Sequence, residues 1–165
     1  MDSRLEKLFQ KQSKKTKFSN ESIKQLEKLF SIKLPKEYKE FLLTFGSVVI
    51  EAGFPDSFIV EYKDEKRVED ILNFLSKQEI IEAYNVLREE NEYEGEAQIP
   101  SYFIPIAHTN ESYNRNYILL HKENQSIWLT MEDENLESDR DSFGFIANSF
   151  SEFLDNIKNY DVFNC

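Results

Sequence analysis

The 165-residue sequence is poor in the residues on which several kinds of function depend. Its one cysteine, Cys165, is the last residue, so no disulfide can form within the chain and a cytoplasmic location is expected. Glycine and proline number four each, too few for long flexible linkers or glycine-built phosphate loops. No apolar run approaches the roughly 18 residues that span a membrane, and residues 1–15 do not read as a signal peptide.

Positive charge is also scarce. Twenty Lys and Arg against 31 Asp and Glu give a formal net charge of −11 at pH 7. Nucleic-acid binding depends on Lys and Arg at phosphates, and anionic membranes attract basic segments, so we expect neither partner. An acidic exterior can instead steer a basic protein toward the domain.

The negative charge is concentrated in two acidic blocks. The first, residues 88–96 (REENEYEGE), has a net charge of −4, and the second, residues 132–141 (EDENLESDRD), has a net charge of −5. Tyrosine is enriched at binding hot spots, so the tyrosine inside the first block joins the acids as a candidate contact. The candidate partner-binding residues are Glu89, Glu90, Glu92, Tyr93, Glu94, Glu96, Glu132, Asp133, Glu134, Glu137 and Asp139. The alternative is that these charges only keep the protein soluble.

The stretch at residues 34–46, LPKEYKEFLLTFG, has the start and stop signals of a short core helix. Its proline suits the first helical turn, and Gly46 suits a left-handed stop. Between them the large apolar side chains form one stripe, opposite a charged face, at Tyr38, Phe41, Leu42 and Phe45. We interpret this stretch as core packing and not as the entry to an active site.

Further helices are predicted at residues 19–30, from apolar residues at three- and four-residue steps, and after two capping-box patterns. The patterns pair a serine with a glutamate three residues later, Ser76 with Glu79 and Ser149 with Glu152. Strands are predicted from short β-branched and aromatic runs at residues 48–50, 58–62, 102–107, 116–121, 126–131 and 143–147. Residues 67–75 fit either a strand or a helix, and Pro105 indicates an edge, an end or a bulge.

This order of elements favours the α+β fold class, as a single domain with a mostly antiparallel sheet and helices packed around it. We divide the chain into a basic N-terminal arm at residues 1–18, with a short helix as one option, the folded domain at residues 19–160, and a C-terminal tail at residues 161–165.

Residues that could carry catalysis do not form a recognisable pattern. His108, which is expected to begin a polar turn, and His121 lack the neighbouring ligands that a zinc site needs. Cys165, at the last position, lacks a nearby base and a held geometry. Trp128 is predicted in the core, with ligand stacking as the less favoured alternative. We therefore expect no enzyme activity, no cofactor and no metal.

Several segments, in order along the chain, resemble the SUKH superfamily of Smi/Knr-type domains. They are residues 23–45 (IKQLEKLFSIKLPKEYKEFLLTF), residues 102–107 (YFIPIA) with the following NYILL and SIWLT strands, and residues 146–154 (IANSFSEFL). Two features depart from the family pattern. Phe45-Gly46-Ser47 replaces a common Asn-Gly turn, and the loop at residues 108–115 (HTNESYNR) has no glycine.

The resemblance implies an α+β fold and a function in protein binding. Bacterial members look like immunity proteins, which are antitoxins that neutralise polymorphic toxins, many of them nucleases. The implied partner is a cognate toxin encoded nearby, and the alternative is a regulatory or scaffold module with a non-toxin partner. The resemblance carries over no catalytic residues. The recurrent positions of the family match core and cap residues here: Pro35, Tyr38, Phe41, Leu42, Pro105, Ala107, Ser149, Phe150 and Phe153.

Overall fold

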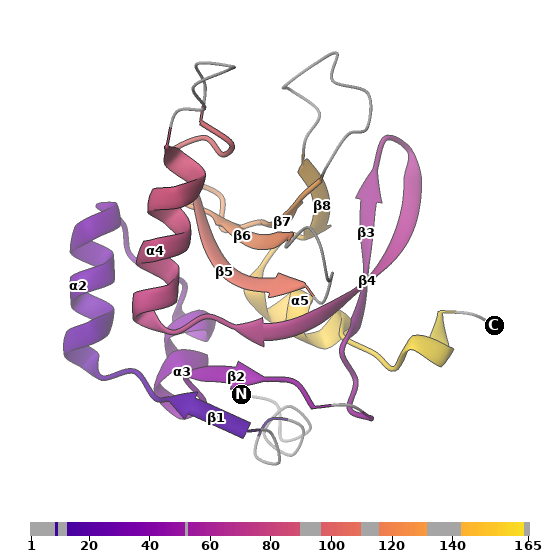
Figure 1. Ribbon diagram of the computed structural model, residues 1–165, viewed down its shortest axis with the longest axis horizontal. Coiled ribbons are helices and arrows are strands. Elements are labelled where there is room, and N and C mark those ends of the chain that lie inside the picture. The colour runs from indigo at the N-terminus through magenta and orange to yellow at the C-terminus, as the bar shows by residue number, and fades with distance from the viewer. Residues whose placement is uncertain are drawn as a thin grey trace.

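The computed structural model describes residue 9 and residues 13–51, 53–89, 97–109, 116–131 and 143–163. The helices in these ranges are α2 (Asn20–Phe30), α3 (Lys36–Thr44), α4 (Lys77–Arg88), α5 (Phe150–Asn156) and the short 3-10 helix η2 (Tyr160–Val162). The strands are β1 (Ser13–Thr16), β2 (Ser47–Val49), β3 (Ser57–Tyr62), β4 (Glu65–Phe74), β5 (Phe103–Thr109), β6 (Tyr117–His121), β7 (Ile127–Thr130) and β8 (Phe143–Ala147). Figure 1 shows their arrangement.

The strands of the described ranges form one antiparallel sheet in the order β1-β2-β4-β3-β8-β7-β6-β5. A further pairing connects β5, the last strand of this order, back to β4. Six strands therefore form a closed circuit, in the order β4, β3, β8, β7, β6 and β5. Strand β4 allows this because residues 65–70 pair with β3, whereas Ile71, Asn73 and Phe74 pair with β5. The molecule is thus a single α+β domain, and residues 67–75, which fitted either element, belong almost entirely to a strand.

Most of the predicted helix caps are present in the structure. Ser19 caps α2, and the capping box of Ser76 and Glu79 at α4 is complete. The second box is only half formed. Its serine hydroxyl accepts from the Glu152 N–H at 3.1 Å, but the Glu152 carboxylate accepts from the N–H of Asn148, one residue too early.

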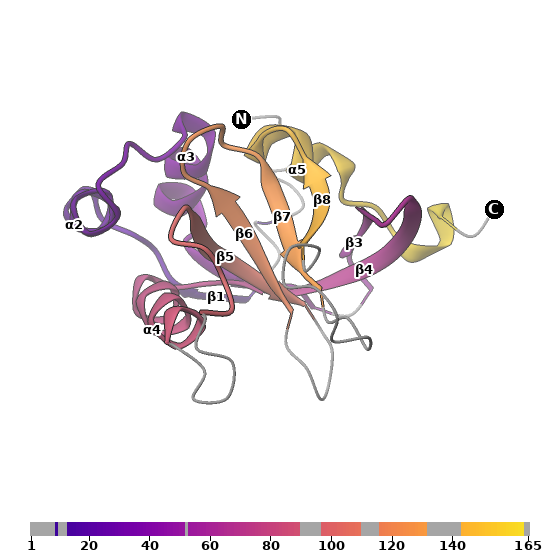
Figure 2. The same cartoon turned by 90° about the horizontal axis from the view of Figure 1, so that it is seen from above.

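The main hydrophobic core lies between the sheet and helices α3 and α5, and it is largely aromatic. Figure 2 shows α3 and α5 along one side of β6, β7 and β8, with α4 on the other side. The ring of Phe41 lies 4.6 Å from that of Phe74 on β4 and 5.4 Å from that of Phe150 on α5. The predicted stripe is confirmed, because Tyr38, Phe41, Leu42 and Phe45 are all buried.

Within residues 1–18, strand β1 pairs with β2 and Phe9 is buried against Phe41 and Phe74. The bulge suggested by Pro105 is confirmed, since the β5–β6 register shifts between Pro105 and Ala107. The division of the chain into arm, domain and tail stays a prediction.

Lys122, in the turn between β6 and β7, connects two helices through their aromatic residues. Its ammonium lies 5.2 Å from the ring centre of Phe30 on α2 and 5.4 Å from that of Tyr84 on α4. Those two rings also meet edge to face, at 4.9 Å. Burial, together with nearby Arg88, lowers the pKa of Lys122. The helices α2 and α4 are therefore joined by a cation held over two rings.

Gly46 follows α3 at a point where the chain passes close to the backbone of Thr16 and Lys17. Its φ is +69°, and a Cβ there would lie 1.9 Å from the carbonyl oxygen of Thr16 and 2.6 Å from the Cα of Lys17. Only glycine fits, because the left-handed conformation and the backbone contact both exclude a side chain.

We expect Gly46→Ala to destabilise the fold much more than Gly53→Ala. Gly53 also has a positive φ, of +90°, but nothing lies within 4 Å of its added Cβ. The strain alone should cost about 1–2 kcal/mol, and the clash at Gly46 should add about 2 kcal/mol. Urea unfolding of the two variants measures both terms. Equal losses would show that the backbone contact at Gly46 relaxes without cost.

Candidate functional site

Most of the predicted partner-binding residues lie outside the described residues. These are Glu90, Glu92, Tyr93, Glu94, Glu96, Glu132, Asp133, Glu134, Glu137 and Asp139. Glu89 is described and exposed, and it caps the C-terminus of α4, where its N–H donates to the carbonyls of Asn85 and Val86. The structure does, however, describe the residues that flank both acidic blocks.

The residues on the two sides of the first acidic block are hydrogen-bonded to each other. The N–H of Ile99 donates to the carbonyl of Leu87 at 3.2 Å. The guanidinium of Arg88 donates to the carbonyl of Ile99 at 2.7 Å. The residues before and after the first acidic block therefore lie side by side at the end of α4.

The residues on the two sides of the second acidic block are also paired. Thr130 at the end of β7 faces Phe143 at the start of β8 in the antiparallel register. The hydroxyl of Thr130 accepts from the N–H of Tyr117 at 2.8 Å, which joins the start of β6 to the same point.

Both pairs rest on a second, smaller hydrophobic cluster. Its buried members are Leu87, Ile99, Phe103 and Leu119, and the residues packed against it at the edge are Tyr84, Tyr117, Trp128 and Phe143. The rings of Phe103 and Phe143, which flank different blocks, lie 4.9 Å apart. Figure 1 shows the end of α4 together with β7 and β8 in the upper part of the molecule. The fold thus brings the ends of the two acidic blocks to one surface.

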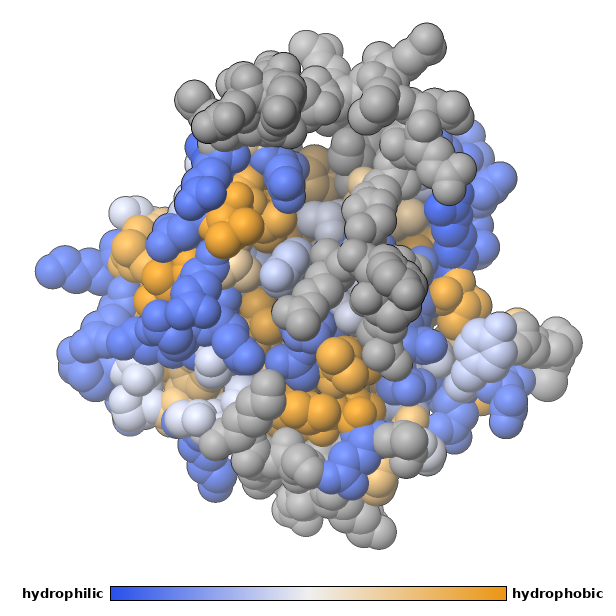
Figure 3. Space-filling view, in the orientation of Figure 1, coloured by the Kyte–Doolittle hydropathy of each residue, from blue (hydrophilic) through white to orange (hydrophobic). Residues whose placement is uncertain are grey.

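Two aromatic residues extend this surface along the sheet. Trp128 on β7 pairs with Phe145 on β8, and their rings meet edge to face at 5.3 Å. Both side chains are partly exposed, so Trp128 lies at the border of the second cluster and not in the main core. In Figure 3 hydrophobic residues reach the surface beside α4. We call Trp128, Phe143 and Phe145 the aromatic face.

Sequence reasoning missed the aromatic face. The signal was present as alternation in β7, where buried Ile127 and Leu129 flank partly exposed Trp128. Because every residue of this run except the last is apolar, the pattern did not show which side faces the core.

The two histidines have structural partners. His108 lies inside β5 and does not begin a turn, because the strand pairing with β4 and β6 continues through it; its Nδ1 is 3.2 Å from the carbonyl of Thr109. His121 ends β6, accepts from the N–H of Glu123 at its Nδ1, and stacks on Tyr102 at 4.7 Å. Among the described residues, no three His, Cys, Asp or Glu side chains gather to hold a metal ion.

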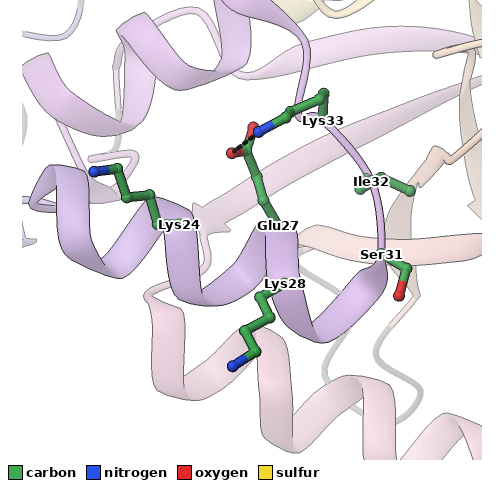
Figure 4. A pocket seen from close by; sticks show the side chains of 6 residues that line it. All are labelled: Lys24, Glu27, Lys28, Ser31, Ile32 and Lys33. Atoms are coloured by element: carbon green, nitrogen blue, oxygen red, sulfur yellow. Dashed lines mark ion pairs between the residues drawn. The ribbon is translucent and has the colours of Figure 1, made fainter.

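An open hollow of about 510 Å³ lies beside α2 and the turn that follows it, lined by Lys24, Glu27, Lys28, Ser31, Ile32 and Lys33 (Figure 4). The carboxylate of Glu27 accepts from the N–H of Leu34 at 2.9 Å and lies 3.5 Å from the ammonium groups of both Lys33 and Lys39. In Figure 4, Lys24 and Lys28 point away from it. Glu27 thus connects α2 to α3, and its polar atoms are already in use.

The partners of Glu27 determine its pKa. Burial alone would raise the pKa, but the hydrogen bond from Leu34 and the charges of Lys39 and Lys33 outweigh burial and hold it below the ordinary value. The charged form therefore stabilises the fold.

A protein-family model, the SMI1/KNR4 family (SUKH-1), matches residues 17–156, which include most of the main core and the residues flanking both acidic blocks. The chain belongs to the SMI1/KNR4 family. This SUKH family includes immunity-protein domains of toxin systems. No curated protein sequence matches the chain. Within the described part of this SUKH domain, no helix is long and apolar enough to cross a membrane.

Glu27→Gln should reduce the free energy of unfolding by about 1 kcal/mol at pH 7. Because the folded pKa lies below the unfolded one, this stability is present above about pH 4.5 and is lost as the pH falls through the folded pKa. The stability difference between the wild type and the variant should therefore shrink below that pH. Urea unfolding at a series of pH values tests this expectation, and a constant difference down to pH 3 would contradict it.

Proposed function

We propose that this SUKH domain is a non-catalytic immunity protein, an antitoxin that binds and neutralises a cognate toxin. A nuclease-type toxin domain is the favoured target. The observation that supports this proposal most is the convergence of the two acidic blocks, whose flanking residues Leu87, Ile99 and Phe143 belong to one cluster. Family membership supports it independently.

Electrostatics gives the proposal a mechanism. A nuclease presents a basic cleft to the phosphates of its substrate, and an acidic protein surface can occupy that cleft in their place. Blocks with net charges of −4 and −5 that start from one surface act on the same partner. Attraction at long range accelerates association at low salt, and contact at short range excludes the nucleic acid.

Co-expression with the toxin-like product of a neighbouring gene tests the proposal directly. We expect the cells to survive and the two proteins to purify together. Cell death in the presence of the folded SUKH domain, with no co-purification, would contradict the immunity function for that pair. A stable complex that leaves the toxin active would favour the regulatory or scaffold alternative.

Charge reversal tests which surface makes the contact. We expect either of two fourfold substitutions to lysine to weaken binding by at least about 100-fold at low salt, as loss of several charge pairs implies. One changes Glu89, Glu90, Glu92 and Glu94, and the other changes Glu132, Asp133, Glu134 and Glu137. A matched control with the same change in charge substitutes the exposed residues Glu21, Glu37, Glu65 and Glu123.

Isothermal titration calorimetry with the toxin domain measures the three affinities, and thermal melting confirms that each variant is folded. An equal loss in the control and in the block variants would show that only net charge matters. Unchanged affinity in both block variants would remove the acidic blocks from the interface.

A further inference from the structure

The aromatic face is a surface without a cover among the described residues. Helices α3 and α5 pack on the opposite side of β6–β8, through buried residues such as Ile118, Leu129 and Ile146. On the outer side Trp128 and Phe145 remain partly exposed although they contact each other. Neighbouring aromatic residues that reach the surface of a sheet mark a binding site more often than isolated ones.

The ring of Trp128 is held in place before any partner arrives. Its indole N–H donates to the hydroxyl of Ser126 at 2.7 Å, and that hydroxyl lies 2.5 Å from the side-chain oxygen of Asn124. The polar atom of the tryptophan is therefore satisfied internally. What remains on the surface is an apolar ring in a fixed orientation, which binds with little loss of conformational entropy.

The surroundings of the aromatic face are acidic. Glu61 on β3 pairs with Phe145 on β8, which places the two side chains on the same side of the sheet. More than half of the Glu61 side chain is exposed, and its ion pair with Lys66, at 3.6 Å, is also exposed and therefore weak. In the sequence, the second acidic block ends two residues before Phe143, which lies on the same strand as Phe145.

We propose that the aromatic face binds an arginine of a basic protein partner, whose guanidinium stacks on the ring of Trp128, contacts the ring of Phe145 and pairs with Glu61. Aromatic rings beside a carboxylate suit arginine better than lysine, because the planar guanidinium can stack and form two hydrogen bonds at once. This proposal rests on the proposed function for the identity of the partner. It adds that the aromatic face makes the specific contact, whereas the acidic blocks provide the long-range attraction.

The single tryptophan of the chain allows a direct measurement, because all tryptophan emission comes from Trp128. The probes are two synthetic peptides of equal length and charge, one of alternating Gly and Arg and one of alternating Gly and Lys. Both are attracted by the acidic blocks, so their difference reports the stacking and the paired hydrogen bonds that only a guanidinium provides. We expect the Arg peptide to change the Trp128 emission and to bind on the order of tenfold more tightly.

Substitutions separate stacking from simple apolar contact. Phe145→Leu keeps an apolar side chain and the fold but removes the ring, so it should lower the affinity for the Arg peptide roughly threefold to tenfold. Phe145→Tyr should keep that affinity. Glu61→Gln should weaken binding more than Glu65→Gln, its matched control at an exposed position on the same hairpin. Tyr160→Ser, at an exposed tyrosine in η2, controls for general loss of aromatic surface.

Equal affinities for the two peptides, with unchanged Trp128 emission, would overturn the proposal. So would an emission change on concentrating the protein alone, because a second copy would then cover the face. Titrating the same variants with the toxin domain distinguishes a failure of the aromatic contact from a failure of the immunity function. A toxin that binds Phe145→Leu as tightly as the wild type contradicts the aromatic contact and leaves the immunity function intact. Failure of the toxin to bind at all contradicts the proposed function, and the peptides still decide the aromatic contact.

Discussion

The double pairing of β4 is the constraint on which the rest of the structure depends. Its first part pairs with β3 and its last residues pair with β5, so one strand joins the beginning and the end of the circuit. The closure places the end of α4 beside the end of β7 and the start of β8, where Leu87 and Phe143 belong to one cluster. Phe74 at the end of β4 then anchors α3 and α5 beneath the sheet through Phe41 and Phe150.

The two hydrophobic clusters differ in composition and in the segments that they hold together. The main core is dominated by phenylalanine rings in edge-to-face and tilted contacts, which need no polar partner. The second cluster is smaller and partly open, with Tyr117, Trp128 and Phe143 at its edge. Side chains of the main core hold helices on the sheet, whereas those of the second cluster hold the residues that flank the two acidic blocks.

Local features of the fold could be predicted from the sequence, because their causes lie within a few residues. The stripe from Tyr38 to Phe45 and the capping box at Ser76 are examples, and both are confirmed. The convergence of the acidic blocks could not be predicted, since it requires β4 to reach β5 and Phe103 to meet Phe143 across the sheet. The buried Glu27 was missed for a related reason: its partner Leu34 follows seven residues later, beyond the helix.

The way in which both acidic blocks are attached has a consequence for how much change in sequence they tolerate. At the first block Ile99 binds the carbonyl of Leu87, and at the second Thr130 faces Phe143 across a strand ladder, so main-chain atoms make much of each attachment. Backbone attachments do not depend on the identity of the intervening side chains. We therefore expect changes in the length or sequence of the segments between these fixed ends to leave the scaffold unaltered.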